Sequence, residues 1–160
     1  MSSAVNAKKI GDVAKSLGIT ARTIRFYEEE GLLSSFRTEG GTRLYSEEDI
    51  TRLKVIVRLA DVGFSINMIK QLATARQTCQ TGAESSKKVG HIINTLEKEV
   101  VSRKILLEEL MAELHQTKQV IHQCHHCSNE PNRKGCPNCP IHQHLDSLNL
   151  LHLIWDQAHS

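Results

Sequence analysis

The 160-residue sequence predicts a mainly α-helical fold: a winged helix-turn-helix followed by a long coiled-coil helix, a cysteine-rich loop and a short C-terminal helix. Three observations carry this prediction. The first 78 residues divide into short amphipathic segments with helix caps and glycine turns, residues 91–124 repeat apolar residues every seven positions, and four cysteines fall within residues 124–139. Aromatic residues make up only 4% of the chain, which suits a helical core of Leu, Ile and Val.

The beginning of the chain predicts a helix-turn-helix. Residues 10–17 place apolar side chains on one face of a short helix, which Gly18 ends. Thr20 then caps a second helix that runs through residues 22–30. Two short helices joined by a tight turn with glycine make this motif.

The second helix has an inward and an outward face. Ile24, with Phe26 and Tyr27, can pack inward. The outward side chains are cationic or hydrogen-bonding, as a recognition helix needs to meet phosphates and base edges: Arg22, Thr23 and Arg25.

A basic hairpin follows at residues 34–45, with Gly40 and Gly41 at its tip. Arg37 and Arg43 lie on its two arms, where a wing contacts backbone phosphates beside the groove. Tyr27 and Tyr45 can either donate to phosphates or pack in the core. The candidate DNA-binding residues are therefore Thr20, Arg22, Thr23, Arg25, Tyr27, Arg37, Arg43 and Tyr45.

Two further helices are expected after the wing. Ser46, followed by three acidic residues, caps a helix that continues to Gly63. Ser65 caps another helix that starts at Ile66.

A coiled coil is predicted from His91 to Cys124. Apolar residues recur at the a positions Ile93, Val100, Leu107, Leu114 and Ile121. The d positions are mixed: Leu96, Arg103, Leu110, Thr117 and Cys124. One long helix cannot bury this seam on itself, so a partner helix is expected, most simply from a second copy of the chain. The chain would then be a homodimer.

The cysteine-rich loop predicts a metal site. Two CxxC pairs, Cys124 with Cys127 and Cys136 with Cys139, are separated by eight residues. Each CxxC turn directs two sulfurs toward one point, so four thiolates come within reach of one ion. A metal bound there is either a structural staple or the signal that the protein reads. Residues 145–155 are expected to form a short amphipathic packing helix.

Several classes of protein are excluded or disfavoured. No run of about 18 apolar residues exists, so no membrane-spanning helix is expected. The first residues lack a secretory signal, which indicates a cytoplasmic protein in which clustered cysteines bind metal rather than form disulfides. Four thiolates would leave no open coordination position, and no paired general acid and base is evident, so an enzyme is not expected.

The ordered motifs of residues 10–14, 23–33, 43–46 and 63–65 resemble the MerR family of bacterial transcription regulators. The resemblance covers about the first half of the chain closely, and the long helix is similar to the family's antiparallel dimerisation helix. It implies a homodimer that binds a palindromic operator in double-stranded promoter DNA. Effector binding would distort the DNA and realign the promoter for RNA polymerase.

Metal-sensing members of the family resemble this chain further. Cys79 lies before the long helix, where members that respond to divalent ions carry a cysteine, and an antiparallel partner would bring it near the other subunit's loop. The implied ligands are Cys79, Cys124, Cys127, Cys136 and Cys139, with a soft divalent ion such as zinc, cadmium, lead or mercury. The segment between Cys79 and Cys124 is about ten residues longer than the simplest family pattern.

Two alternatives remain at this point. The loop could hold an iron–sulfur cluster, as in the family's redox-sensing branch, although its cysteines are spaced more widely than in that branch. It could also hold structural zinc in a constitutive DNA-binding protein. The expected organisation is a DNA-binding domain at 1–78, a dimerisation helix at 79–123 and an effector-binding loop with its helix at 124–160.

Overall fold

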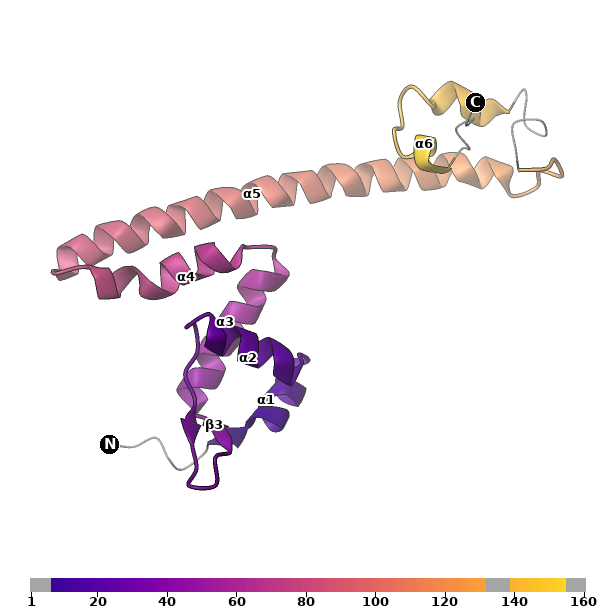
Figure 1. Ribbon diagram of the computed structural model, residues 1–160. Helices are drawn as coiled ribbons and strands as arrows, with labels where there is room; N and C mark the ends of the chain where they lie inside the picture. The colour runs from indigo at the N-terminus through magenta and orange to yellow at the C-terminus, as the bar shows by residue number, and fades with distance from the viewer. Residues whose placement is uncertain (1–6, 132–138, 155–160) are drawn as a thin grey trace, which may run out of the picture. The chain divides into compact units, whose positions relative to one another are not determined.

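The computed structural model describes residues 7–131 and 139–154 and divides into two compact units (Figure 1). The N-terminal unit lies within residues 1–97 and the C-terminal unit within residues 98–160. The boundary falls inside the long helix, so both units contain part of it.

The N-terminal unit has the predicted winged helix-turn-helix. Its helical segments, in order, are α1 (Ile10–Leu17), α2 (Ala21–Glu29), α3 (Glu47–Asp61), α4 (Ile66–Thr74), the 3-10 turn η1 (Ala75–Thr78) and the first part of α5 (Gly82–Ile121). Its strands are β1 (Lys8–Lys9), β2 (Phe36–Arg37) and β3 (Arg43–Tyr45). These form an antiparallel sheet in the order β1-β3-β2.

The sheet contains a strand that the sequence pattern did not predict. β1 adds to the free edge of the wing hairpin, with Lys8 opposite Tyr45. On the other edge of β3, Phe36 lies opposite Leu44. Two residues are too few for a period-two pattern, so β1 leaves no signal in the sequence.

The turn between α1 and α2 depends on Gly18. Its φ of 65° is left-handed, a conformation that glycine adopts without the steric penalty of a Cβ atom. The backbone then turns back on α1, and the Ile19 N–H donates to the Ala14 carbonyl at 3.1 Å. The helix stop predicted at Gly18 is therefore confirmed.

The predicted caps of α3 and α4 are also confirmed. Ser46 and Asp49 form a reciprocal capping box: the Asp49 N–H donates to Ser46 Oγ at 3.1 Å, and the Ser46 N–H donates to Asp49 Oδ2 at 3.0 Å. At α4, the Met68 N–H donates to Ser65 Oγ at 3.3 Å. These bonds satisfy amide groups that the first turn of a helix leaves without intrahelical partners.

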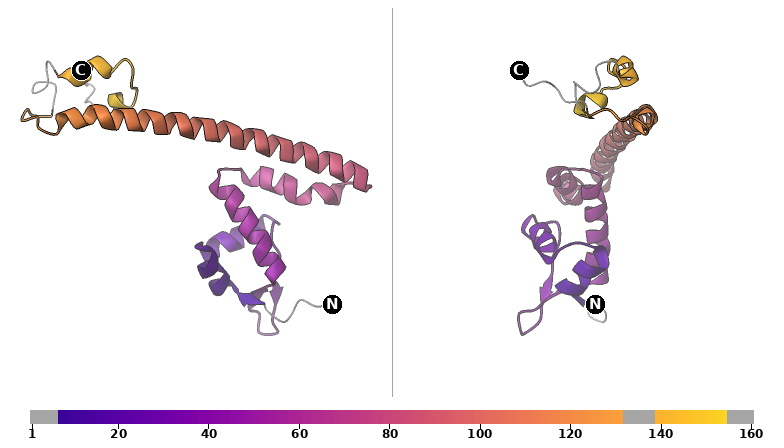
Figure 2. Two further views of the ribbon diagram at one scale, coloured as in Figure 1. Left: turned by 180° about the vertical axis from the view of Figure 1, so that it is seen from behind. Right: turned by 90° about the vertical axis from the view of Figure 1, so that its right-hand side faces the viewer.

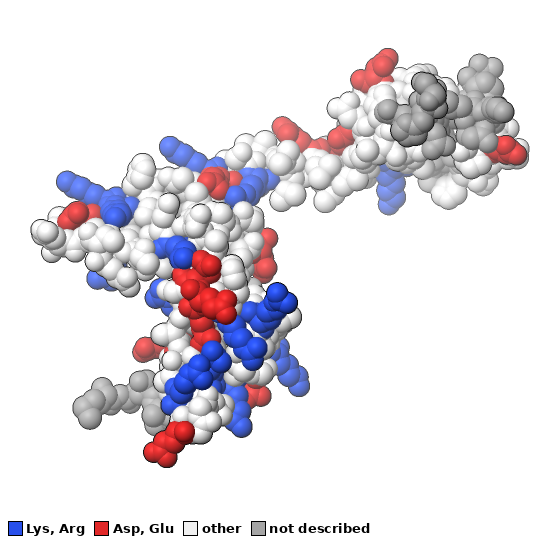
Figure 3. Space-filling model, viewed as in Figure 1, with Lys and Arg blue, Asp and Glu red and all other residues white. Residues whose placement is uncertain are grey.

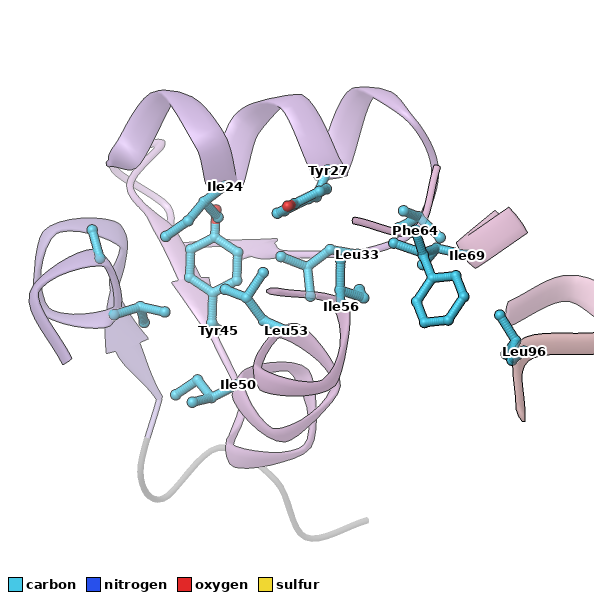
Figure 4. Close-up of a cluster of buried hydrophobic side chains, with 13 residues drawn as sticks. Ile24, Tyr27, Leu33, Tyr45, Ile50, Leu53, Ile56, Phe64, Ile69 and Leu96 are labelled. Carbon is cyan, nitrogen blue, oxygen red and sulfur yellow. The ribbon is translucent and has the colours of Figure 1, made fainter. Parts of the chain in front are cut away.

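One core holds this unit together (Figure 4). Tyr45 of the wing is fully buried and lies in the same cluster as Ile24 of α2 and Leu53 of α3. Phe64 and Ile69 extend the cluster toward α5. Figures 1 and 2 show α4 running beside the first turns of α5. Ile92 and Leu96 of these turns pack in or against this core.

Helix α5 begins nine residues before the predicted seam. Its start is capped, because the Glu84 N–H donates to Thr81 Oγ1 at 3.2 Å and the Gln80 N–H donates to Glu84 Oε2 at 3.0 Å. The helix then runs for 40 residues. No helix in the described parts of the chain is both long enough and apolar enough to span a membrane.

The C-terminal unit consists of the rest of α5, the turns η2 (His122–Cys124) and η3 (Pro140–His144), and α6 (Leu151–Ile154). A small group of buried side chains, here called the C-terminal mini-core, fixes η3 and α6 beside the last turns of α5: Val120, Ile141, Leu148 and Leu151 (Figure 2). The Leu150 N–H also donates to Glu113 Oε1 on α5 at 2.9 Å.

The helix predicted at residues 145–155 is therefore much shorter in the structure. Turns occupy most of residues 145–150, and α6 spans only Leu151–Ile154. The reason is local hydrogen bonding, because Ser147 Oγ and its own N–H both bond to the His144 carbonyl. Trp155 lies outside the described residues.

Candidate functional site

Helix α2 presents the predicted polar residues at its first turns. Thr20 Oγ1 accepts a hydrogen bond from the Thr23 N–H at 3.1 Å, and the two hydroxyl oxygens are 2.8 Å apart. Arg22 and Arg25 are exposed, whereas Ile24 faces the core. The capped end of α2 therefore displays two guanidinium groups beside a pair of hydroxyl groups.

The wing presents the other two predicted arginines. Arg37 is exposed and donates to the Gly41 carbonyl at 3.2 Å, which folds its side chain along the hairpin tip. Gly41 has a φ of 79°, a left-handed conformation that the tight tip requires. Arg43 is half-buried and points back toward α2, where it meets Glu28.

The two elements enclose a shallow hollow of about 360 Å³. Arginines from both elements line it: Arg25, Arg37 and Arg43. Glu28, Glu29 and the loop between α2 and the wing complete its walls. Figure 3 shows Lys and Arg side chains gathered on the N-terminal unit with acidic side chains between them. The structure thus brings together cationic residues that are separated in the sequence.

Glu28 joins α2 to the wing, and the sequence pattern did not identify it. Its Oε1 accepts a hydrogen bond from the Tyr45 hydroxyl at 3.0 Å, and its Oε2 lies 3.1 Å from Arg43 Nε. Burial raises the pKa of Tyr45 to about 12, and the hydrogen bond to Glu28 adds to this rise. No sequence signal points to this cluster, because its members come from separate elements.

The two candidate tyrosines lie in the core. Tyr45 is 0% exposed and Tyr27 is 6% exposed. Burial also raises the pKa of Tyr27, with a further contribution from the Asp61 charge. Of the two roles that the sequence left open for these residues, burial favours packing over direct contact with phosphates.

Cys79 belongs to the N-terminal unit and follows η1 directly. Its thiol is half-buried and donates to the Ala75 carbonyl at 3.2 Å. Next to it, η1 and the first turns of α5 surround a mainly apolar hollow of about 600 Å³, lined in part by Thr78, Lys88 and His91. Cys79 is thus held at the end of η1 by a contact within the N-terminal unit.

The first CxxC pair lies at the end of α5. The Cys127 N–H donates to the Cys124 carbonyl at 3.0 Å, which is the tight turn expected of a CxxC pair. Cys124 is half-buried, whereas Cys127 is exposed. In the second pair, Cys139 is half-buried directly before η3, and Cys136 lies outside the described residues.

One cysteine from each pair packs against the C-terminal mini-core. Cys124 comes from the end of α5 and Cys139 from the start of η3, and both contact the same cluster. Among residues 7–131 and 139–154, no group of three or more His, Cys, Asp or Glu side chains is arranged to hold a metal ion. Within the described residues, the structure therefore brings one cysteine of each pair to the same cluster without defining a complete ligand set.

Histidines surround the same turn. The rings of His122 and His125 are in edge-to-face contact, with centroids 4.5 Å apart. His126 lies 6.3 Å from His125 by the same measure. His125 and His126 belong to the Cys124–Cys127 turn, and His122 lies two residues before it.

Comparison with known proteins agrees with this fold. The sequence model of the MerR HTH family regulatory protein matches residues 8–76. Over 116 residues the chain is 40% identical to the HTH-type transcriptional regulator YfmP of Bacillus subtilis (strain 168), spanning 71% of this chain and 76% of YfmP. Over 135 residues it is 31% identical to heavy metal-dependent transcription regulator 2 of Rhizobium meliloti (strain 1021), spanning 82% of each.

A solved structure resembles the chain as well. HiNmlR, a MerR family regulator that lacks the sensor domain, has been crystallised bound to promoter DNA. It matches 72% of this chain and 93% of its own length, with a TM-score of 0.56 and 26% identity. The winged helix-turn-helix and these matches define a protein of the DNA-binding regulator class. The chain belongs to the MerR family of helix-turn-helix transcription regulators, whose members are regulators and not enzymes.

Proposed function

We propose that this chain is a metal-responsive transcription regulator. It binds a palindromic operator in promoter DNA as a homodimer and activates transcription when a soft divalent ion binds the cysteine loop. The observation that carries the proposal is the approach of Cys124 and Cys139, one from each CxxC pair, to the same mini-core at the end of α5. A relative described as heavy metal-dependent, which is similar over 82% of the chain, supports it.

The DNA interface consists of the first turns of α2 and the wing. Arg22 and Arg25 are exposed where a recognition helix enters the major groove, and Thr20 and Thr23 place hydroxyl groups beside them. Arg37 and Arg43 contact backbone phosphates, which position the protein without reading sequence. The hollow that Arg25 shares with both wing arginines supports a single continuous surface.

The metal ligands are Cys124, Cys127, Cys136 and Cys139. Their thiolates form a soft donor set that suits zinc, cadmium, lead or mercury better than magnesium or calcium. A tetrathiolate site would contribute folding free energy to the loop, because its ligands come from both sides of the mini-core. Cys79 joins the site from the partner subunit, because an antiparallel pair of helices places the start of one beside the end of the other.

The homodimer forms through α5. Its a positions Val100, Leu107 and Leu114 are between 44% and 63% exposed in the single chain. A second α5 removes this surface from water, which is the driving force for a coiled coil. Ion binding at the helix end then changes the geometry of the pair, and DNA distortion realigns the promoter for RNA polymerase in the cytoplasm.

Transcription in vitro tests this function. The purified protein is titrated with zinc, cadmium, lead or mercury on templates that carry a duplex sequence selected by the protein itself. We expect at least one ion to raise transcription, and we expect the response to disappear when Cys124, Cys127 and Cys139 are replaced by Ser. Replacement of Cys79 alone distinguishes a metal ligand from a packed thiol. Loss of a packed thiol would leave the ion concentration at half-maximal response unchanged, whereas loss of a ligand would change it. An unchanged response in the triple variant would refute metal sensing by the loop.

A second candidate is a constitutive DNA-binding protein with structural zinc. The contact of Cys124 and Cys139 with the mini-core favours it, because a metal bound by these cysteines would hold the loop against the mini-core even without acting as a signal. It predicts that metal removal unfolds the loop while the transcription supported by DNA-bound protein stays constant. An iron–sulfur cluster would give a brown protein, so a colourless anaerobic preparation with stoichiometric zinc would remove that alternative.

A further inference from the structure

Glu28 places an acidic side chain inside the arginine-lined hollow. The Glu28 side chain is only 14% exposed, and its two oxygens contact the wing separately. One accepts from the fully buried Tyr45 hydroxyl, and the other pairs with Arg43 Nε. A carboxylate near DNA repels phosphates, so its presence here calls for a compensating role.

We propose that Glu28 is a positioning residue of the DNA interface, which fixes Arg43 and strand β3 against α2 so that Arg43 donates to a backbone phosphate. This inference rests on the proposed DNA-binding function. The ion pair uses Nε of Arg43, and the two terminal nitrogens of the guanidinium can still donate to an anion. Glu28 itself touches no DNA and acts through Arg43.

The geometry favours positioning over simple neutralisation. An arginine on a two-stranded wing has many rotamers, and ordering it at the moment of DNA binding opposes association. Glu28 orders it beforehand. The Tyr45 hydroxyl in turn orders Glu28 from within the core, so the carboxylate has one defined orientation. Arg37, by contrast, donates to a carbonyl of its own hairpin.

Glu29 provides a matched control. It is the next residue of α2, lines the same hollow and carries the same charge, but it is exposed and makes none of the wing contacts described for Glu28. If charge alone mattered, Glu28→Ala and Glu29→Ala would both bind DNA more tightly. If Glu28 positions Arg43, Glu28→Ala should weaken DNA binding, whereas Glu29→Ala should not.

The experiment uses the full-length protein and a duplex recovered from a random-sequence pool by the unaltered protein. Affinity is measured by fluorescence anisotropy at several KCl concentrations. We expect Glu28→Ala to weaken binding about tenfold and to lower the salt slope by about one, as for the loss of one phosphate contact. Glu29→Ala should bind equally well or more tightly. Equal or tighter binding by Glu28→Ala would overturn the proposal.

Two further variants keep the test decisive. Glu28→Gln keeps one oxygen that can accept from Arg43 Nε, and its NH2 group can donate to the Tyr45 hydroxyl oxygen, so it should recover part of the lost affinity. Arg43→Lys keeps the positive charge but loses the Nε contact, so it should bind about as weakly as Glu28→Ala, whereas Arg37→Lys should bind nearly as the parent does. Parent-like binding by Arg43→Lys would contradict positioning even if Glu28→Ala did not fold. If the unaltered protein selects no duplex, DNA binding itself fails, which is a separate outcome.

Discussion

The Tyr45 hydroxyl is a titratable group that the fold buries and hydrogen-bonds. Its ring is fully buried in the N-terminal core, and its hydroxyl donates to Glu28. Burial, and then the hydrogen bond and charge of Glu28, disfavour the phenolate, which raises the pKa of Tyr45 to about 12. In the unfolded chain the same group titrates near pH 10.

This difference predicts a loss of stability at high pH. Between pH 10 and about 12 the unfolded chain has lost the Tyr45 proton while the folded chain keeps it, so the free energy of unfolding falls as pH rises. The contribution is fully present below pH 10 and amounts to about 2–3 kcal/mol. Urea unfolding from pH 9 to 12 should show a smaller decline for Tyr45→Phe than for the parent. Parallel pH profiles for the two proteins would contradict this expectation.

At the residue scale, the sequence predicted which residues carry positive charge to the surface but not what holds them. Arg22, Arg25 and Arg37 are exposed as the helix and hairpin patterns indicate. The contacts of Arg43 and Tyr45 with Glu28 depend on how β3 packs on α2, and Tyr45 lies 17 residues from Glu28 in the chain. No local period encodes such a contact.

At the scale of elements, the helix starts are set by hydrogen bonds that can be read from the sequence. The capping box of Ser46 and Asp49 satisfies the first amide groups of α3. We expect Ser46→Ala to lower the free energy of unfolding by about 1 kcal/mol, the usual effect of losing an N-cap. The measurement is urea unfolding followed by circular dichroism.

Ser86 offers the matched control for this substitution. It is exposed within α5, where alanine is the better helix former, so Ser86→Ala should be neutral or stabilise by a few tenths of a kcal/mol. Replacement of Ser by Ala is therefore expected to lower the free energy of unfolding at position 46 and to keep or slightly raise it at position 86. Similar losses in both variants would show that the capping box adds nothing.

Helix α2 is also tied to α4 by an ion pair. Lys70 Nζ lies 2.7 Å from Glu30 Oε2, and both side chains are about one-third exposed. Partly exposed pairs of this kind contribute about 0–1 kcal/mol, so the pair sets orientation more than stability. Together with the two wing contacts of Glu28, it links the end of α2 to the wing on one side and to α4 on the other.

Elements with strong local signals were predictable, and those set by tertiary contacts were not. Caps and glycine turns located α1 to α4. Strand β1 exists because β3 offers it an edge, and α6 is short because Ser147 bonds to the His144 carbonyl. Residues 145–155 have apolar spacing that suits a helix, but that spacing instead supplies Leu148 and Leu151 to the mini-core.

At the scale of the whole molecule, the proposed homodimer can be tested with two adjacent valines. Val100 is an a position of the seam, whereas Val101 lies on the outer face of the helix, and the two are 44% and 56% exposed in the single chain. We expect Val100→Glu to shift the protein toward monomer in sedimentation experiments, because it would bury a charge between the helices. Val101→Glu should leave the dimer intact. Dimers of equal stability in both variants would rule out this seam.

Metal removal should act on the two units differently. The segment from Cys124 onward has fewer than 40 residues and contributes three buried apolar side chains to the mini-core, which Val120 of α5 completes. Chains this short usually need a metal or disulfides to fold. We expect a thiol-competitive chelator to raise hydrogen exchange in residues 122–131 and 139–151, while residues 10–61 keep their protection. Unchanged exchange near the mini-core would show that the segment folds without metal.

The exposed apolar stripe of α5 also affects how much of the protein accumulates in a cell. Leu106, Leu107 and Met111 are each more than 60% exposed in the single chain. On the proposed dimer, pairing follows mass action, so newly made chains at low concentration would stay unpaired and open to proteases. Regulator abundance would then fall more steeply than synthesis rate whenever synthesis drops below the level that sustains pairing.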